Sequence, residues 1–194
     1  MTSILIMGSS HINRFEHYIQ NRPALNNLNI QGNVTINYFG ISGGQVLKSD
    51  HCQQWETAMQ LYQPEHLVVQ IGGNDLDSAD QSVAKTEEII YRLVSLLQLF
   101  KSRYNVRHVT ILQFINRTST RNTSPNIYNQ TVIQANRLLK TILINNPNIH
   151  YWNLRGVKNS YANIFLDGVH FNNHGNFKYF RNIRGAITTS LNRS

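Results

Sequence analysis

Short apolar segments alternate along the chain with longer segments of helical periodicity, and this alternation constrains the fold more than any other feature of the sequence. The apolar segments are rich in branched residues, and we predict strands at about residues 3–8, 33–39, 66–71, 107–114 and 148–154. Strands that are separated by helices are typical of a parallel sheet with crossover helices on its faces. The sequence therefore predicts an α/β protein, a three-layer α/β/α sandwich around a mainly parallel, five-stranded sheet.

The clearest helical segment covers about residues 82–104, where apolar residues recur at spacings of three, four and seven. Two more helices are predicted at about 126–145, ending before Pro147, and at about 174–191. A weaker helix is predicted at about 45–61. These helices lie between and after the strands, as the crossover pattern of a parallel sheet requires.

Length and composition fit one domain of ordinary size. A chain of 194 residues can bury most of the surface that its unfolded form exposes, so we expect a single domain over residues 1–194. The sequence contains one cysteine, Cys52, and therefore forms no internal disulfide. We see neither a signal peptide nor an apolar run of the ~20 residues needed to cross a membrane, and we expect a cytoplasmic protein.

The net charge is strongly positive, at +8 for pH 7 with histidine neutral. Such a charge suits an anionic partner, which includes nucleic acid, a membrane surface and an anionic substrate. The basic residues are scattered along the chain without a run of five or six, so a solvated basic surface explains them equally well. Charge by itself therefore assigns no partner.

Polar and glycine-rich segments follow the predicted strands at the places where a parallel sheet builds its sites. In open α/β sheets, ligands bind beyond the carboxyl ends of the strands. We expect the segments at these ends to meet at one edge of the sheet, with the loop at 116–126 shaping specificity. The segments are Gly8-Ser9-Ser10, GISGGQ from residue 40, GGND from residue 72, NRTSTRN from residue 116 and LDGVHFNNHG from residue 166.

Asp167 and His170 form the most informative pair in these segments. They stand three residues apart on a turn that contains glycine, so the carboxylate can reach one ring nitrogen while the other faces a cleft. This arrangement holds an imidazole in the tautomer that takes a proton from a serine hydroxyl. Ester hydrolysis also needs N–H donors for the developing oxyanion, which backbone amides and an asparagine side chain can supply.

Taken together, these segments resemble the consensus blocks of the SGNH hydrolases, also called GDSL-type esterases. The blocks occur in the family's order, and the resemblance covers essentially the whole chain. It implies a flavodoxin-like SGNH hydrolase fold and a serine esterase that needs neither cofactor nor metal. It also implies that Ser10 is the nucleophile, His170 the general base and Asp167 its orienting partner, with the oxyanion held by Gly43, Asn74 and the amide of Ser10.

A narrower resemblance is to a eukaryotic branch of the family, some of whose members are esterase domains of LINE-type retrotransposon first open reading frame proteins. It rests on IGGNDL, the polar loop after the fourth strand, Asn136 within IQANRLL and DGVHFNNHG. One position departs from the family pattern, because Ser9 stands where most members have the aspartate of Gly-Asp-Ser. That aspartate is not the triad acid, so the departure concerns the positioning of the nucleophile loop.

Each of these signals also has a purely structural interpretation. Ser9 or Ser10 can cap the helix that follows the first strand, and the Asp–His pair can belong to an ordinary turn. His11, on the first turn of that helix, is placed where it can line the cleft, but we interpret it as a surface residue. Cys52 is interpreted as a small buried residue, because the adjacent His51 points in another direction along a helix and the two cannot share a metal.

Three aspartates, Asp75, Asp77 and Asp80, follow the glycine pair after the third strand. Their spacing lacks the glycine and the terminal glutamate of a calcium-binding loop. We interpret them as caps that precede the helix beginning near residue 82.

Two functions remain open from the sequence. The first is a serine esterase that acts through an acyl-enzyme on a small-molecule or lipid ester, either an acetyl or short-chain acyl ester or a lysophospholipid. The second is a catalytically weak SGNH-like module that binds nucleic acid or an anionic membrane through its basic surface. Intact serine, histidine, aspartate and asparagine blocks favour the first function, whereas Ser9 and the positive charge favour the second.

Overall fold

The fold is built on a parallel sheet, and the computed structural model describes residues 1–146, 148–157 and 162–193 of the chain. Five strands pair in parallel in the order β2-β1-β3-β4-β5, which is the order of flavodoxin-like folds. The predicted fold class is therefore confirmed. The strands are β1 (Thr2–Ser9), β2 (Val34–Ile41), β3 (His66–Gln70), β4 (His108–Leu112) and β5 (Ile149–Trp152).

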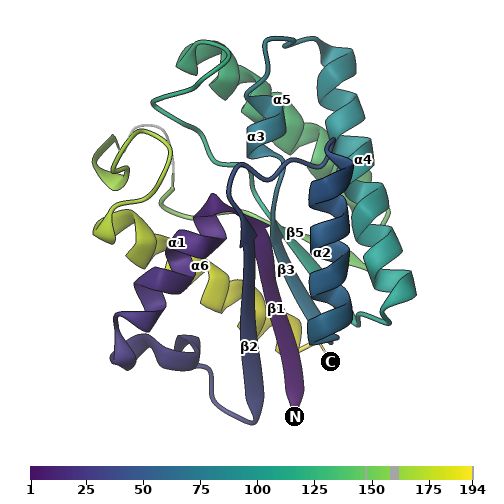
Figure 1. The fold of residues 1–194 in the computed structure, drawn as a ribbon, viewed down its shortest axis with the longest axis vertical. Helices are drawn as coiled ribbons and strands as arrows, with labels where there is room; N and C mark the ends of the chain where they lie inside the picture. Colours follow the sequence, from purple (N-terminus) through teal and green to yellow (C-terminus); the bar gives the residue numbers. More distant parts are fainter. Residues whose placement is uncertain (147, 158–161, 194) are drawn as a thin grey trace.

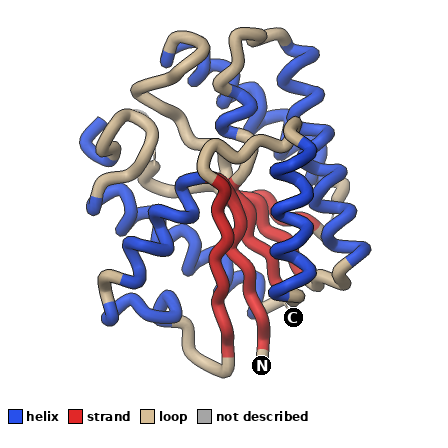
Figure 2. The backbone as a smooth tube through the Cα atoms, viewed as in Figure 1, coloured by secondary structure: helices blue, strands red, loops and turns tan. Residues whose placement is uncertain are grey.

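Helices cover both faces of the sheet and make the outer layers of the sandwich (Figures 1 and 2). Helices α1 and α6 share one apolar cluster with the sheet, and α2, α4 and α5 share the other. The short α3 and the 3₁₀ turns η1 and η2 lie in the connections. The bounds are α1 (Ser10–Gln20), η1 (Pro23–Asn29), α2 (Ser49–Tyr62), α3 (Gly73–Leu76), α4 (Val83–Arg103), α5 (Pro125–Ile144), η2 (Ala162–Ile164) and α6 (Asn173–Leu191).

The apolar run of β1 is continuous because both faces of this strand are buried. Ile4 and Ile6 pack in the cluster with α1 and α6, while Leu5 and Met7 pack in the cluster with α2, α4 and α5. All four side chains are inaccessible to solvent. Alternate residues of a strand point to opposite faces, so a strand covered by helices on both sides needs no polar alternation.

Helix α2 begins at Ser49, four residues later than the predicted start at residue 45. The backbone N–H groups of Val46 and Leu47 donate to the carboxylate of Asp75 at 3.0 and 3.1 Å, which holds this segment in a turn over the sheet edge. The end of α5 at Ile144 agrees with the sequence, but Pro147, to which the stop was assigned, lies outside the described residues.

Across the described part of the chain, none of the helices is both long enough and apolar enough to cross a membrane. The longest, α4 with 21 residues and α5 with 20, are amphipathic and pack one face on the sheet. Their role is to cover the sheet. The loops at the carboxyl ends of the strands gather at one end of the molecule (Figure 2).

Candidate active site

Strand β1 runs directly into helix α1, and this junction places two serines at the carboxyl edge of the sheet. Ser9 is buried in the N-cap position, but its side chain makes no capping hydrogen bond. Ser10 is the first residue of the helix. A Cβ atom at Gly8 would lie 2.5 Å from the Ile12 side chain and 2.6 Å from a carbonyl oxygen of β3, so glycine permits this close approach.

Three of the predicted site residues meet in a hydrogen-bonded chain. The Oγ atom of Ser10 lies 2.9 Å from Nε2 of His170, and Nδ1 of His170 lies 2.7 Å from Oδ2 of Asp167. Ser10 comes from the start of α1, whereas the other two come from the loop before α6, and 160 positions separate Ser10 from His170. The fold therefore brings together the residues that the sequence singled out.

The carboxylate of Asp167 is held by several donors at once. Burial acts to raise its pKa, but hydrogen bonds from the backbone and ring of His170 and from the backbone of Val169 together hold the pKa well below its usual range. The backbone bonds measure 2.7 Å from His170 and 3.0 Å from Val169, and both end on Oδ1. Oδ2 is thereby left for the imidazole, and Asp167 stays ionised at neutral pH.

His11 is buried behind His170, so its interpretation as a surface residue is wrong. Only 5% of its surface is exposed, and its ring centroid lies 5.5 Å from that of His170 and 5.2 Å from that of Phe171. The loop before α6 folds over the first turn of α1 and covers it. Burial above all, and then the charges of Arg117 and His170, lower the pKa of His11 to about 3, so its ring is neutral.

The two remaining predicted site residues, Gly43 and Asn74, line the same cleft as Ser10. Asn74 has a fixed orientation, because its Oδ1 accepts a hydrogen bond from Arg117 at 2.8 Å and its Nδ2 donates to the carbonyl oxygen of Gly44 at 3.1 Å. Gly43 adopts a φ of +71°, in the left-handed region that favours glycine, and nothing lies within 4 Å of where its Cβ would be.

Arg117 is a site residue that sequence reasoning missed. Its side chain is only 6% exposed, and its guanidinium pairs with Asp77 at 3.3 Å and lies 5.0 Å from the ring centre of Tyr128. A buried charge is tolerated when an opposite charge pairs with it, because an unpaired charge loses its hydration without compensation. Here the paired guanidinium also fixes the amide of Asn74. The available signal was a lone arginine directly after a strand, which the sequence does not distinguish from an ordinary loop residue.

Two of the three aspartates after β3 were wrongly interpreted as helix caps. The carboxylate of Asp75 holds the loop after β2, and burial raises its pKa to about 6. That of Asp77 pairs with Arg117 and accepts backbone hydrogen bonds from residues 121 and 122 at 3.0 and 3.1 Å. Asp80 does lie at the start of α4, where Ser82 is the cap and donates its own N–H to Asp80 at 2.9 Å.

The loop at 116–126 fixes the turn that carries Asp167. The backbone N–H groups of Thr118 and Ser119 donate to the carbonyl oxygen of Gly168 at 2.8 and 3.3 Å. Gly168 has a φ of +82°, and a Cβ there would lie 2.6 Å from the Cβ of Ser119. Only glycine allows the two loops to approach so closely, so the loop after β4 positions the turn of Asp167 as well as lining the cleft.

The cleft at this edge has a volume of about 630 Å³ and polar walls. Among the described residues that line it, Val169 alone has an aliphatic side chain.

His51 also lines the cleft and accepts a hydrogen bond from the backbone of Gln45 at 3.0 Å. Cys52 is half-buried rather than buried, with its thiol 3.3 Å from the carbonyl oxygen of Val46. Within the described residues, no group of three or more His, Cys, Asp or Glu side chains is placed to hold a metal ion.

Residues 7–176 match the sequence model of the GDSL-like lipase/acylhydrolase family. The chain belongs to this family. As a GDSL-like acylhydrolase it is a serine ester hydrolase, with Ser9 in place of the aspartate that gives the family its name. A search of curated proteins gave no significant match to this acylhydrolase.

Solved structures similar to this acylhydrolase share its fold at low sequence identity. A GDSL-like lipase from Bacteroides thetaiotaomicron is 16% identical with a TM-score of 0.74, over 97% of this chain and 89% of that one. A catalytic mutant of an acetylxylan esterase from Geobacillus stearothermophilus is 18% identical, with a TM-score of 0.65 over 94% and 92%. The psychrotrophic esterase EstA from Pseudoalteromonas sp. is 14% identical, with a TM-score of 0.68 over 99% and 100%. The narrower resemblance to the retrotransposon branch stays a prediction.

Proposed function

We propose that the protein hydrolyses acetyl and other short-chain acyl esters through an acyl-enzyme on Ser10. The observation that carries this proposal is the hydrogen-bonded chain from Asp167 through His170 to Ser10, with contacts of 2.7 and 2.9 Å. Because Nδ1 of His170 donates its proton to Asp167, Nε2 keeps a lone pair for the serine hydroxyl. The nucleophile and its base are thus already within proton-transfer distance.

In the first half of the reaction, Oγ of Ser10 attacks the ester carbonyl carbon while its proton moves to Nε2 of His170. Collapse of the tetrahedral intermediate breaks the bond to the alcohol oxygen, which takes that proton and leaves. Water then attacks the acyl-serine, again with His170 as base, and the carboxylic acid and free Ser10 are regenerated. Asp167 keeps the imidazole oriented and stabilises its charged form throughout.

The oxyanion of the intermediate is assigned to three donors. The N–H of Ser10 belongs to the first turn of an eleven-residue helix, where backbone N–H groups have no intrahelical acceptor and the helix dipole is positive. The N–H of Gly43 lies on an open loop, and the side-chain amide of Asn74 is held by Arg117. Donors that are fixed before the reaction stabilise developing charge most effectively.

The walls of the cleft favour a short acyl group over a fatty one. A long acyl chain needs an apolar channel, because each buried CH₂ contributes about 0.8 kcal/mol only when it leaves water for an apolar surface. The described walls offer one aliphatic side chain, that of Val169. Of the ester classes that the sequence left open, acetyl and short-chain esters therefore fit better than lysophospholipids with long chains.

The test is the rate of hydrolysis of p-nitrophenyl esters with two, four and eight acyl carbons by the native protein and by Ser10→Ala and Ser9→Ala. We expect Ser10→Ala to lose activity by about 10³-fold or more. Ser9→Ala keeps most of the activity, because the Ser9 side chain makes no capping hydrogen bond and Ser9 does not line the cleft. The rate is expected to fall as the acyl chain lengthens.

Equal rates for the native protein and Ser10→Ala on every ester would overturn the proposed mechanism. A rate that rises towards eight carbons would instead overturn only the short-chain assignment. Binding of nucleic acid or anionic membrane through the basic surface stays a prediction from the charge, and salt-dependent binding to single-stranded RNA or anionic vesicles would test it.

A further inference from the structure

A second hollow, with a volume of about 400 Å³, lies beside the catalytic cleft between α1 and the start of α6. Asn13 and Arg14 line both the hollow and the cleft, so the two spaces adjoin at these side chains. The two helices lie next to each other on the same face of the sheet (Figure 1). A ligand that enters the cleft can therefore extend into the hollow.

The polar residues of α1 lead from the nucleophile into this hollow. Five polar residues recur at spacings of three and four, which places them along one face of the helix and its C-cap. They are Ser10, Asn13, Arg14, His17 and the C-cap residue Asn21. Since a helix rises about 1.5 Å per residue, this face extends roughly 16 Å beyond Ser10. That length accommodates a substrate portion of two or three sugar-sized or glycerol-phosphate-sized units at most.

No acidic residue lines the described walls of the hollow, and Asp167, the ion-pair partner of Arg14 at 3.9 Å, lines the adjoining cleft. Arg22 is already held in place, because it donates to the carbonyl oxygen of Tyr18 and to Oδ1 of Asn173, both at 3.1 Å, and lies 3.9 Å over the Tyr18 ring. A guanidinium has five N–H donors, so further donors remain for a ligand. Arg14, at the junction of the two spaces, has a side chain that is 46% exposed.

The hollow is lined by residues that lie next to the proposed triad. Arg14 stands 3.9 Å from Asp167, and Phe171, the neighbour of His170 in sequence, lines the hollow. In the proposed reaction, His170 returns its proton to the departing alcohol oxygen, which must therefore lie beside the imidazole. The proposed oxyanion donors Gly43 and Asn74 line the cleft but not the hollow.

We propose that this hollow binds the alcohol portion of the ester, and that Arg14 and Arg22 recognise an anionic group on it, a phosphate or a carboxylate. Guanidinium groups bind both anions through paired, charge-assisted hydrogen bonds. This inference rests on the function proposed above and adds the substrate class, a short-chain ester of an anionic alcohol. Water is consumed, and the short-chain acid and the anionic alcohol are released.

The experiment compares two esters that differ only in the anion, 1-acetylglycerol 3-phosphate and 1-acetylglycerol. We expect the native protein to prefer the phosphate ester in kcat/KM by about tenfold or more, as charge-assisted hydrogen bonds allow. In the double variant Arg14→Gln/Arg22→Gln, the ratio of the two kcat/KM values falls towards one. The matched control is Arg137→Gln/Lys140→Gln on the exposed face of α5, which removes the same net charge and keeps the native ratio.

A second pair of esters distinguishes phosphate from carboxylate, namely an O-acetylated methyl glucuronoside and the same acetylated methyl glucoside. A preference in either pair that the double variant abolishes supports the inference and names the anion. A native ratio near one in both pairs overturns it, as does a ratio that survives in the double variant. An equal loss of kcat/KM for charged and neutral esters in the double variant also overturns it, since the arginines would then support catalysis and not anion recognition.

The proposed function fails separately, if Ser10→Ala hydrolyses both acetylglycerol esters at the native rate.

Discussion

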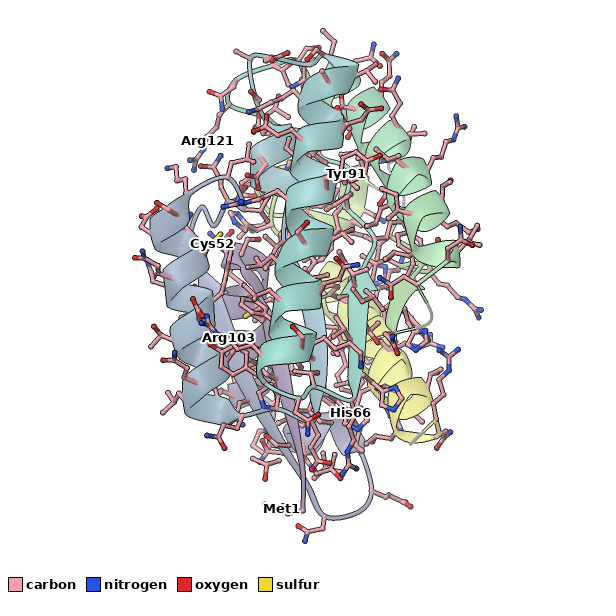
Figure 3. All side chains as sticks on the ribbon, turned by 90° about the vertical axis from the view of Figure 1, so that its right-hand side faces the viewer. Met1, Cys52, His66, Tyr91, Arg103 and Arg121 are labelled. Carbon is pink, nitrogen blue, oxygen red and sulfur yellow. The ribbon has the colours of Figure 1, made fainter. Side chains whose placement is uncertain are left out.

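Serine and histidine meet at both ends of the sheet, but in very different surroundings. At the carboxyl end, Ser10 lies 2.9 Å from His170 and both line a cleft. At the amino end, Ser190 of α6 lies 2.5 Å from His66 of β3, and these residues are only 4% and 1% exposed. Figure 3 shows the separation of the two ends, with His66 near one end of the molecule and Arg121, which lines the cleft, near the other.

The two histidines also differ in what surrounds their rings. His66 stacks on His108 with ring centres 5.0 Å apart, and His108 stacks on His150 at 6.3 Å. Burial above all lowers the pKa of His66 to about 4, and burial also lowers the pKa values of His108 and His150. His170 instead has an ionised carboxylate on its second nitrogen. A serine–histidine contact is therefore no catalytic site by itself, because the ring also needs a group that stabilises its charge and a substrate needs access.

The largest expected difference between the two ends is in catalysis. Asp167→Asn is expected to lower kcat by about 10³-fold or more, because the amide does not hold the imidazole in the productive tautomer. Ser190→Ala, the corresponding disruption at the amino end, leaves kcat at its native value. Steady-state kinetics on p-nitrophenyl acetate measure kcat for both variants. A similar loss of kcat in the two variants would contradict the functional difference between the two ends of the sheet.

The next difference concerns ion pairs. Arg117→Met leaves Asp77 charged and buried, and it is expected to lower the free energy of unfolding by about 3–5 kcal/mol. Arg107→Met breaks the exposed pair with Glu65 at 3.0 Å near the amino end and costs less than about 1 kcal/mol. Urea denaturation measures both changes. Equal losses would show that burial does not decide the importance of these pairs.

Acidification is expected to destabilise both ends, because burial lowers the pKa of His11 to about 3 and that of His66 to about 4. The folded state holds the pKa of His66 near 4, below the ordinary value of 6.5, so the unfolded state binds a proton first as the pH falls. The contribution of His66 to stability is thus complete above pH 6.5 and is lost between pH 6.5 and 4, by on the order of 2–3 kcal/mol. Asp75 acts in the opposite sense, because its pKa is raised to about 6 and its protonation favours the folded state.

A variant separates the contribution of His66 to the pH dependence of stability from the contributions of the other titrating groups. His66→Gln lacks the titrating ring but keeps Asp75, so its unfolding free energy should fall less steeply than that of the native protein between pH 6.5 and 4. Urea denaturation at several pH values gives the two curves. Parallel curves over this range would contradict the assignment to His66.

The smallest expected effect is the difference in stability lost when either of two glycines with positive φ is replaced by alanine. Gly168→Ala combines an unfavourable φ of +82° with a contact of 2.6 Å to Ser119, and it should cost about 1–3 kcal/mol of stability. Gly32→Ala, at the start of the segment leading into β2, has a φ of +103° but nothing within 4 Å of the new Cβ, and should cost about 1 kcal/mol. Thermal unfolding compares them. Only Gly168→Ala should also slow ester hydrolysis, because it displaces the turn that carries Asp167.

Much of the fold was accessible from the sequence because it depends on local patterns. The long amphipathic helices and the apolar strands follow from periodicity, and α4 at Val83–Arg103 lies within one residue of its predicted bounds at each end. The contact of Ser10, His170 and Asp167 was predicted from the resemblance to the SGNH hydrolases, together with the expectation that loops at the carboxyl ends of parallel strands meet at one edge. The assignment of their chemical roles stays a proposal.

What the sequence did not reveal depends on contacts between distant segments. Arg117 is buried because Asp77, 40 positions earlier, lies opposite it, and no local pattern marks such a pair. His11 is buried because the loop carrying Phe171 folds over it. Asp75 delays the start of α2 from 28 positions away, which is why the predicted helix began too early.

Under the proposed mechanism, the separation of 160 positions between Ser10 and His170 also determines when activity arises during synthesis. Translation adds Ser10 to the chain 160 residues before His170, so the serine leaves the ribosome well ahead of its proposed base. A nascent chain that stops before Asp167 carries a serine with ordinary alcohol reactivity. The proposed esterase chemistry is thus withheld from the growing polypeptide until the loop that carries Asp167 and His170 has emerged and packed over the first turn of α1.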